Sequence, residues 1–180
     1  MHETSLNQVI TDYITGSEVE ATTYEDLRQS IARILVEDKK YPKQAIKAKV
    51  PLRFDIQGKT VEYEMDFLVH VQGKPALLVA FCPGAVASYL SQYVAAARIV
   101  SEPPPPLVYI TDTKEGMILR TADGQRLGEG FSSLPDYKTL QDMVETHACP
   151  AVDEKKKEQA KNLVHAFFAL SSGCCSDNCS

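Results

Sequence analysis

The chain has 180 residues, of which 44% are hydrophobic and 24% are charged, which is an ordinary composition for a globular protein with one buried core. No apolar run approaches the roughly 20 residues that cross a bilayer, and the first ten residues lack a secretory pattern, so we expect a cytoplasmic protein without membrane contact. A formal net charge of −5 argues against a general nucleic-acid coat, because phosphate binding needs clustered Lys and Arg. It leaves room for a local basic face.

The five cysteines are unevenly placed, and three of them, Cys174, Cys175 and Cys179, crowd the last seven residues. In a reducing compartment they are most simply free thiols. The three also lack the C-x₂-C pairs of structural zinc sites, so we predict that residues 171–180 form a flexible, Cys-rich tail.

Two segments before residue 40 favour helix. Leu6 to Ile14 form a short amphipathic segment, for which we predict a helix. Residues 22–37 give a stronger pattern, because Thr22 and Glu25 have the spacing of a capping box. The apolar residues that follow recur on one helical face: Leu27, Ile31, Ile34 and Leu35.

Three consecutive strands are predicted next, over residues 49–56, 60–71 and 75–81. The first alternates between apolar and polar side chains, which is typical of a half-buried strand. Tight turns separate the strands at residues 57–59 and 72–75, each containing Gln-Gly-Lys. The third strand is apolar on both faces, which indicates a central strand covered on both sides.

The remainder alternates helices and strands within a single domain. We predict helices over residues 85–100, 135–147 and 153–170, strands over 107–111 and 117–121, and a short returning strand over 125–127. We therefore expect an N-terminal segment (1–21), a core (22–150), a C-terminal helix (151–170) and the tail. The fold class is α/β, with a mixed β-sheet flanked by helices.

Several short motifs occur in an order that resembles a known family. They are Tyr24-Glu25-Asp26-Leu27-Arg28-Gln29, Tyr41-Pro42-Lys43, Asp66, Leu77-Leu78-Val79 and Pro83. Over roughly residues 22–124 the chain resembles the N-terminal nuclease domain of type I restriction enzyme R subunits, in the short stand-alone form found in bacteria. That resemblance implies a restriction-endonuclease-like fold of the PD-(D/E)XK superfamily.

The resemblance also implies the positions of an active site. The family carries a Glu on the first helix, an Asp on the hairpin strand, and a Gln and a Tyr on the later helix; Glu25, Asp66 and Gln92-Tyr93 match these. We therefore predict Glu25, Asp66 and Gln92 as catalytic positions, and Glu25 and Asp66 as ligands of Mg²⁺ if the protein is active. The family's Glu-x-Lys is absent, because Ala80-Phe81-Cys82 stands there.

This substitution removes what the hydrolysis of a phosphodiester needs. Carboxylates hold the divalent metal that activates water, and Mg²⁺ requires hard oxygen ligands. Alanine offers no ligand, and the soft sulfur of cysteine is unsuited to Mg²⁺. Losing a group such as the lysine costs about 3 kcal/mol, or a hundredfold or more in rate. We expect no cofactor unless other residues substitute.

Substitutes can be named. Glu62, Glu64 and Asp66 alternate and share one strand face, so with Glu25 they form a candidate relocated metal site. Lys74, at the turn, is the candidate cation for that site. The plainer interpretation makes Glu62 and Glu64 the wet side of a sheet. Cys82 is a candidate nucleophile with His70 on the neighbouring strand, or simply a small buried hydrophobe.

Three functional hypotheses follow. The first is a degenerate nuclease-like domain without hydrolytic activity, in a DNA-associated or protein-binding accessory role. The second is an active metal-dependent DNA endonuclease that uses Glu25, Asp66 and Glu62 or Glu64. The third is a protein-interaction domain with no nucleic-acid role. The partners that these imply are DNA, restriction-modification subunits or other proteins; no P-loop or G-x-G-x-x-G supports nucleotide binding.

Overall fold

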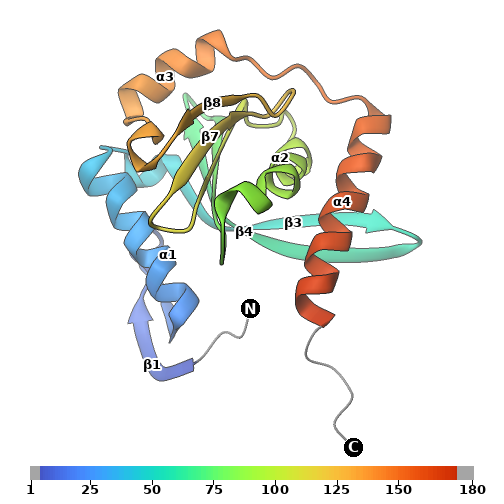
Figure 1. The fold of residues 1–180 in the computed structure, drawn as a ribbon. Coiled ribbons are helices and arrows are strands. Elements are labelled where there is room, and N and C mark those ends of the chain that lie inside the picture. Colours follow the sequence, from blue (N-terminus) through green and yellow to red (C-terminus); the bar gives the residue numbers. More distant parts are fainter. Residues whose placement is uncertain (1–4, 174–180) are drawn as a thin grey trace, which may run out of the picture.

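The computed structural model describes residues 5–173, and its centre is a mixed sheet of six strands (Figure 1). The strands are β3 (Ile46–Ile56), β4 (Lys59–Val71), β5 (Lys74–Phe81), β6 (Leu107–Thr111), β7 (Gly116–Arg120) and β8 (Arg126–Glu129). They lie side by side in sequence order, and β5 and β6 form the one parallel pair. The parallel pair needs a crossover, which the helix between these strands supplies.

Helices cover both faces of this sheet. The α-helices are α1 (Thr23–Arg33), α2 (Leu90–Ile99), α3 (Tyr137–Thr146) and α4 (Glu154–Gly173). Four short turns of helix join them to the strands: η1 (Ile34–Asp38), η2 (Lys43–Ala45), η3 (Val86–Ser88) and η4 (Phe131–Ser133). Helices α1 and α3 contribute to the core cluster on one face, and α2 and α4 contribute to the cluster on the other. The α/β class and the flanked mixed sheet are therefore confirmed.

The two predicted hairpin turns have the backbone that a tight hairpin requires. Gln57 and Gly58 both have positive φ, at 50° and 74°, and Gln72 and Gly73 repeat this at 51° and 78°. Two successive residues of positive φ give the turn whose twist matches that of the flanking strands. These turns fix the register of β3, β4 and β5.

Strand β3 changes the face that it buries part way along its length. Ile46 packs in the cluster beneath α1, whereas Val50 packs in the cluster beneath α2. A regular strand would keep both residues on one face, because side chains alternate with a period of two. Lys49 lies between them with a left-handed φ of 51°. That conformation turns its side chain to the α1 side.

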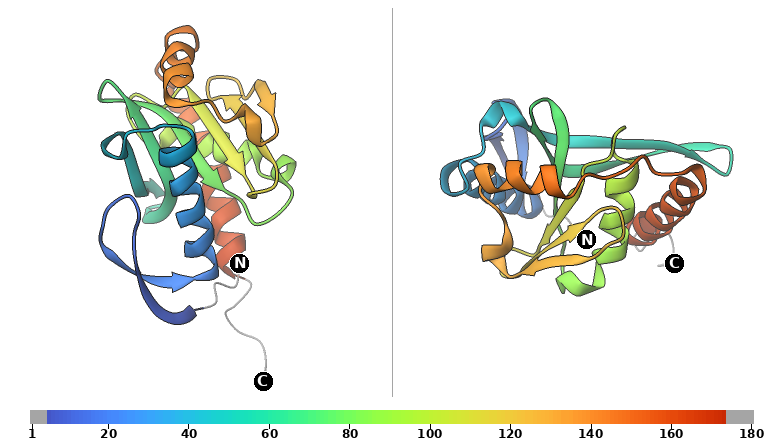
Figure 2. Two further views of the ribbon diagram at one scale, coloured as in Figure 1. Left: turned by 90° about the vertical axis from the view of Figure 1, so that its left-hand side faces the viewer. Right: turned by 90° about the horizontal axis from the view of Figure 1, so that it is seen from above.

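The helix predicted for residues 6–14 is wrong. The segment forms strand β1 (Ser5–Thr11), which pairs antiparallel with β2 (Glu18–Thr22) in a separate two-stranded sheet. We call β1, β2 and the loop between them the N-terminal arm, and it projects from the body beside α1 (Figure 2). The local pattern fitted an amphipathic helix, but pairing with residues seven or more positions later in the chain decided the conformation.

Other boundaries differ by a few residues. The predicted helix over residues 85–100 is divided into η3 and α2. Helix α4 continues to Gly173, three residues beyond its predicted end. The rest of the predicted tail, residues 174–180, lies outside the described range. Among the helices of the described range, none combines the length and the apolar character that a membrane span requires.

Candidate functional site

Asp66 lies where β4 and β5 separate. The pairing of these strands ends with Phe67 opposite Val79, so it stops one residue short of Asp66. Its Oδ2 accepts the backbone N–H of Phe81 at 2.8 Å, and its Oδ1 accepts the hydroxyl of Tyr24 at 2.8 Å. The side chain is buried, and burial raises its pKa to about 6 even though both hydrogen bonds favour the charged form.

The backbone of Phe81 is held by side chains at both of its polar groups. Besides the bond to Asp66, the hydroxyl of Tyr93 on α2 donates to the Phe81 carbonyl at 2.8 Å. The Tyr24 ring on α1 packs edge-on against the Phe81 ring, with centroids 5.2 Å apart. Asp66 and the two tyrosines therefore fasten the end of β5 to both helices. Asp66, which was predicted as a catalytic residue, therefore has a structural role in the fold.

The two family positions that have changed are buried in the core. Ala80 and Cys82 are both 0% exposed and belong to the cluster beneath α2. The Cys82 thiol donates to the carbonyl of Gly84 at 3.4 Å. Burial raises the pKa of this thiol to about 11, which is the opposite of what a nucleophilic cysteine needs.

Lys74 and His70, the residues suggested to assist the site, lie near the start of β5, at the opposite end from Cys82. Lys74 begins this strand and His70 pairs opposite Pro75, whereas Cys82 follows the last residue of the strand. Seven residues of strand span roughly 23 Å, which exceeds the reach of either side chain. The interpretations that placed Lys74 in the site and His70 beside Cys82 are therefore wrong.

Glu25 lies in the first turn of α1, where the Thr22 side chain accepts the backbone N–H of Glu25 and caps the helix. Its carboxylate is buried and accepts hydrogen bonds from the Arg28 guanidinium and from the side-chain amide of Gln29 at 2.6 Å. The Lys49 ammonium completes the set at 3.1 Å from Glu25 Oε2.

Asp12 joins this cluster from the N-terminal arm. Its Oδ2 pairs with Arg28, and its Oδ1 accepts the backbone N–H groups of Ile14 and Thr15 at 2.9 and 2.8 Å. We name the set Asp12, Glu25, Arg28, Gln29 and Lys49 the buried charge cluster. Sequence reasoning overlooked Asp12, because it lies within the segment 6–14 that was expected to be a helix.

The charges of this cluster balance. Two carboxylates, those of Asp12 and Glu25, face two cations, those of Arg28 and Lys49. The hydrogen bonds and the guanidinium lower the pKa of Asp12 and of Glu25 against the opposing effect of burial, and the two carboxylates raise the pKa of Arg28. Both acids therefore stay ionised with protein cations as their counter-charges.

No hydrogen bond or ion pair joins Asp66 to Glu62, Glu64 or Gln92 among residues 5–173. Glu62 and Glu64 are exposed on β4, although Glu64 is near enough to contribute to the raised pKa of Asp66. The Oε1 atom of Gln92 is buried and accepts no hydrogen bond from any residue in the range 5–173. Within that same range, no three His, Cys, Asp or Glu side chains converge closely enough to hold a metal ion.

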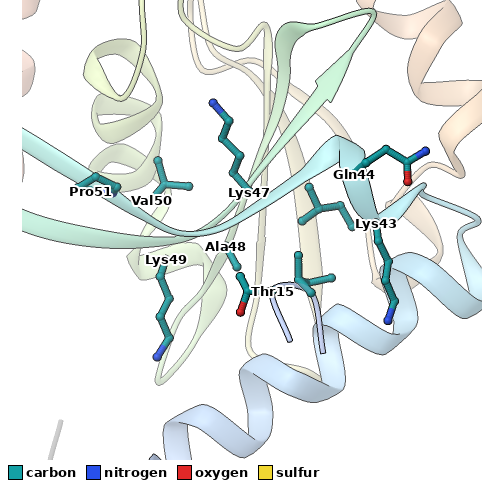
Figure 3. Close-up of a pocket in the computed structure, with 10 residues that line it drawn as sticks. Thr15, Lys43, Gln44, Lys47, Ala48, Lys49, Val50 and Pro51 are labelled. Atoms are coloured by element: carbon teal, nitrogen blue, oxygen red, sulfur yellow. The ribbon is translucent and has the colours of Figure 1, made fainter. Parts of the chain in front are cut away.

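A groove opens beside the buried charge cluster, with a volume of about 460 Å³ (Figure 3). Its walls are the tip of the N-terminal arm and the first half of β3; we call it the β3 groove. Figure 3 shows Lys43 and Lys49 on one side of the strand and Lys47 extending to the other. The lining residues are Ile14, Thr15, Lys43, Gln44 and the six consecutive residues 46–51.

The fold defines the class of the protein as α/β, with a mixed sheet flanked by helices. The family model of the type I restriction enzyme R protein N terminus matches residues 23–135, which is more than half of the chain. The chain therefore belongs to that family. No curated protein and no solved structure matches it.

Proposed function

We propose that this chain is a non-hydrolytic member of the restriction R-protein family that acts by binding, in a DNA-associated or protein-binding accessory role. The observation that carries the proposal is the state of the two retained acids. Asp66 fastens the end of β5, and Glu25 is neutralised by Arg28 and Lys49. Neither carboxylate needs a metal ion to complete its surroundings.

Electrostatics adds a second reason. The buried charge cluster holds two negative and two positive groups, so a divalent cation at Glu25 would bring uncompensated charge into a buried site. Positions 80 and 82 supply a methyl group and a protonated thiol in the core. The oxygen ligand and the ammonium group that support hydrolysis are absent from the strand where the family carries them.

The DNA-associated role is favoured by one segment of the chain. Residues 39–59 contain seven Lys and Arg and a single acidic residue, Asp55, although the whole chain has a net charge of −5. This segment covers β3 and the turns on either side of it. Clustered cations of this kind contact phosphates, and such binding weakens steeply with added salt.

The experiment is a cleavage assay on supercoiled plasmid and on labelled duplexes, with Mg²⁺ or Mn²⁺. We expect no metal-dependent cleavage from the natural chain. Cleavage that Asp66→Ala abolishes, while Asp142→Ala on the exposed face of α3 leaves it intact, would instead establish the active nuclease with relocated ligands. Duplex binding without cleavage, measured against salt, separates a DNA-associated role from a purely protein-binding one.

A further inference from the structure

The outer edge of β3 is uncovered in the described fold. Strand β3 is the first strand of the six-stranded sheet, so it pairs with β4 on one side only. Because six consecutive residues of β3 line the β3 groove, the groove follows the edge of the strand and not one of its faces. An unpaired edge attracts other chains unless something covers or blocks it.

Two features of the β3 edge prevent a continuous β-ladder with another strand. Pro51 has no N–H to donate, and the left-handed Lys49 interrupts the strand. Beside these breaks lies a small apolar strip whose accessible side chains are those of Ile14 and Ala48, which are half-buried, whereas Ile46 and Val50 pack into the core on either face of the sheet. The groove therefore suits an occupant that brings apolar side chains with acidic neighbours and does not extend the sheet.

Nucleic acid fits these features less well than a protein surface does. Lys43 Nζ already donates to the Tyr13 carbonyl at 2.9 Å, and Lys49 Nζ already pairs with Glu25. Lys47 is exposed, and no partner for its ammonium is found in the range 5–173. A phosphate chain would gain few free cations here, and it would make no use of the apolar strip.

A surface of the required chemistry exists on the N-terminal arm. In the pairing of β1 with β2, Val9 lies opposite Glu20 and Thr11 lies opposite Glu18, so these four side chains share one face. Val9 is 66% exposed, the highest value among the exposed large hydrophobic residues of the described range. Glu18 and Glu20 are exposed beside it. We call this surface the acidic arm face.

From this complementarity we infer that the occupant of the β3 groove is the acidic arm face of a second copy of the chain. Val9 enters the apolar strip, and Glu18 and Glu20 face Lys47, the groove lysine whose ammonium has no partner in the range 5–173. Every copy of the chain carries both the β3 groove and the acidic arm face, so a two-fold dimer makes this contact twice. The buried interface area is then twice the area that a single arm buries. The inference goes beyond the proposed function and does not depend on the loss of hydrolysis.

The test is sedimentation velocity of the full chain under reducing conditions, from micromolar to near-millimolar protein, so that cysteines form no cross-links. We expect a concentration-dependent dimer. Val9→Asp, Glu18→Lys and Lys47→Glu should each weaken it by about tenfold or more, since they place a charge in the apolar strip or bring like charges together. The double variant Glu18→Lys/Lys47→Glu should recover much of the loss.

Controls keep the result interpretable. All three substituted side chains are exposed, so each variant should keep the thermal unfolding midpoint of the natural chain. Glu145→Lys, a matched reversal on α3, should leave the dimer unchanged. A monomer at every concentration overturns the inference, and so does a dimer that these variants do not weaken. A short duplex that binds the monomer and loses binding on Lys47→Glu would assign the groove to nucleic acid instead.

Discussion

Replacing Asp66 by Asn should stabilise the protein at neutral pH and not at acidic pH. The carboxylate is buried, and its pKa in the folded chain is raised from 3.8 to about 6. A rise of this size corresponds to about 3 kcal/mol of cost for keeping the folded aspartate ionised above pH 6. An asparagine can still accept the N–H of Phe81 and can donate to the oxygen of Tyr24, so the packing is retained.

The sign follows from proton binding. Between pH 4 and pH 6 the folded chain holds the Asp66 proton and the unfolded chain has released it, so the Asp66 contribution to stability falls as pH rises through this window. Asparagine does not titrate. The variant should therefore match the natural chain near pH 4 and exceed it by up to about 3 kcal/mol above pH 7.

The assay is urea unfolding of both proteins at several values of pH from 4 to 8. The opposite pH dependence of Asp12 and Glu25 is common to both proteins and cancels in the difference. Asp142→Asn, on the exposed face of α3, is the matched control and should change stability by less than about 0.5 kcal/mol. A difference that stays flat with pH, or an Asn variant that is weaker at pH 8, would refute the assignment of a buried ionised carboxylate.

Three further changes test the contacts around the site by urea unfolding. Tyr24→Phe removes one of the two donors to the same buried carboxylate and should cost about 1–2 kcal/mol at pH 8, where the acid is charged, and less near pH 4. Asp12→Ala removes one of the two carboxylates that pair with Arg28, and should lower the free energy of unfolding by about 3 kcal/mol at pH 7. The pKa of Asp12 is lowered in the folded chain, so its contribution to stability is lost as the pH falls. The difference between the two proteins should therefore shrink below pH 4. Gly116→Ala places a methyl 1.9 Å from the Tyr109 hydroxyl oxygen and should cost about 3 kcal/mol.

Each of these has an outcome that would contradict it. An equal loss for Tyr24→Phe at both pH values would make its role one of packing alone. An Asp12→Ala variant as stable as the natural chain would show that the arm is not fastened through Arg28. For the glycine, Gly84→Ala is the control, because its added methyl meets Tyr89 at an ordinary 3.4 Å and should be nearly neutral.

The sequence alone determined the fold class and the layout of the core. The Thr22 cap, the alternation along β3 and the Gln-Gly turns are local signals, and each is present in the structure as predicted. Local signals suffice here because helix caps, strand periodicity and tight turns depend on residues only a few positions apart. The pattern also placed Asp66 on the second strand of the hairpin and Glu25 at the start of the first helix, where the structure has them.

Tertiary structure decided the partners of those residues. The arm is a strand pair because β2 stabilises β1, and a single-segment pattern contains no information on that pairing. The charge cluster joins Asp12, Glu25, Arg28 and Lys49 from three separate segments, and Lys49, whose backbone is left-handed, reaches Glu25 from β3. Burial then sets the pKa of Asp66 near 6. Counter-charges and desolvation are properties of the assembled interior, which is why the state of the retained acids follows from the packing and not from their spacing along the chain.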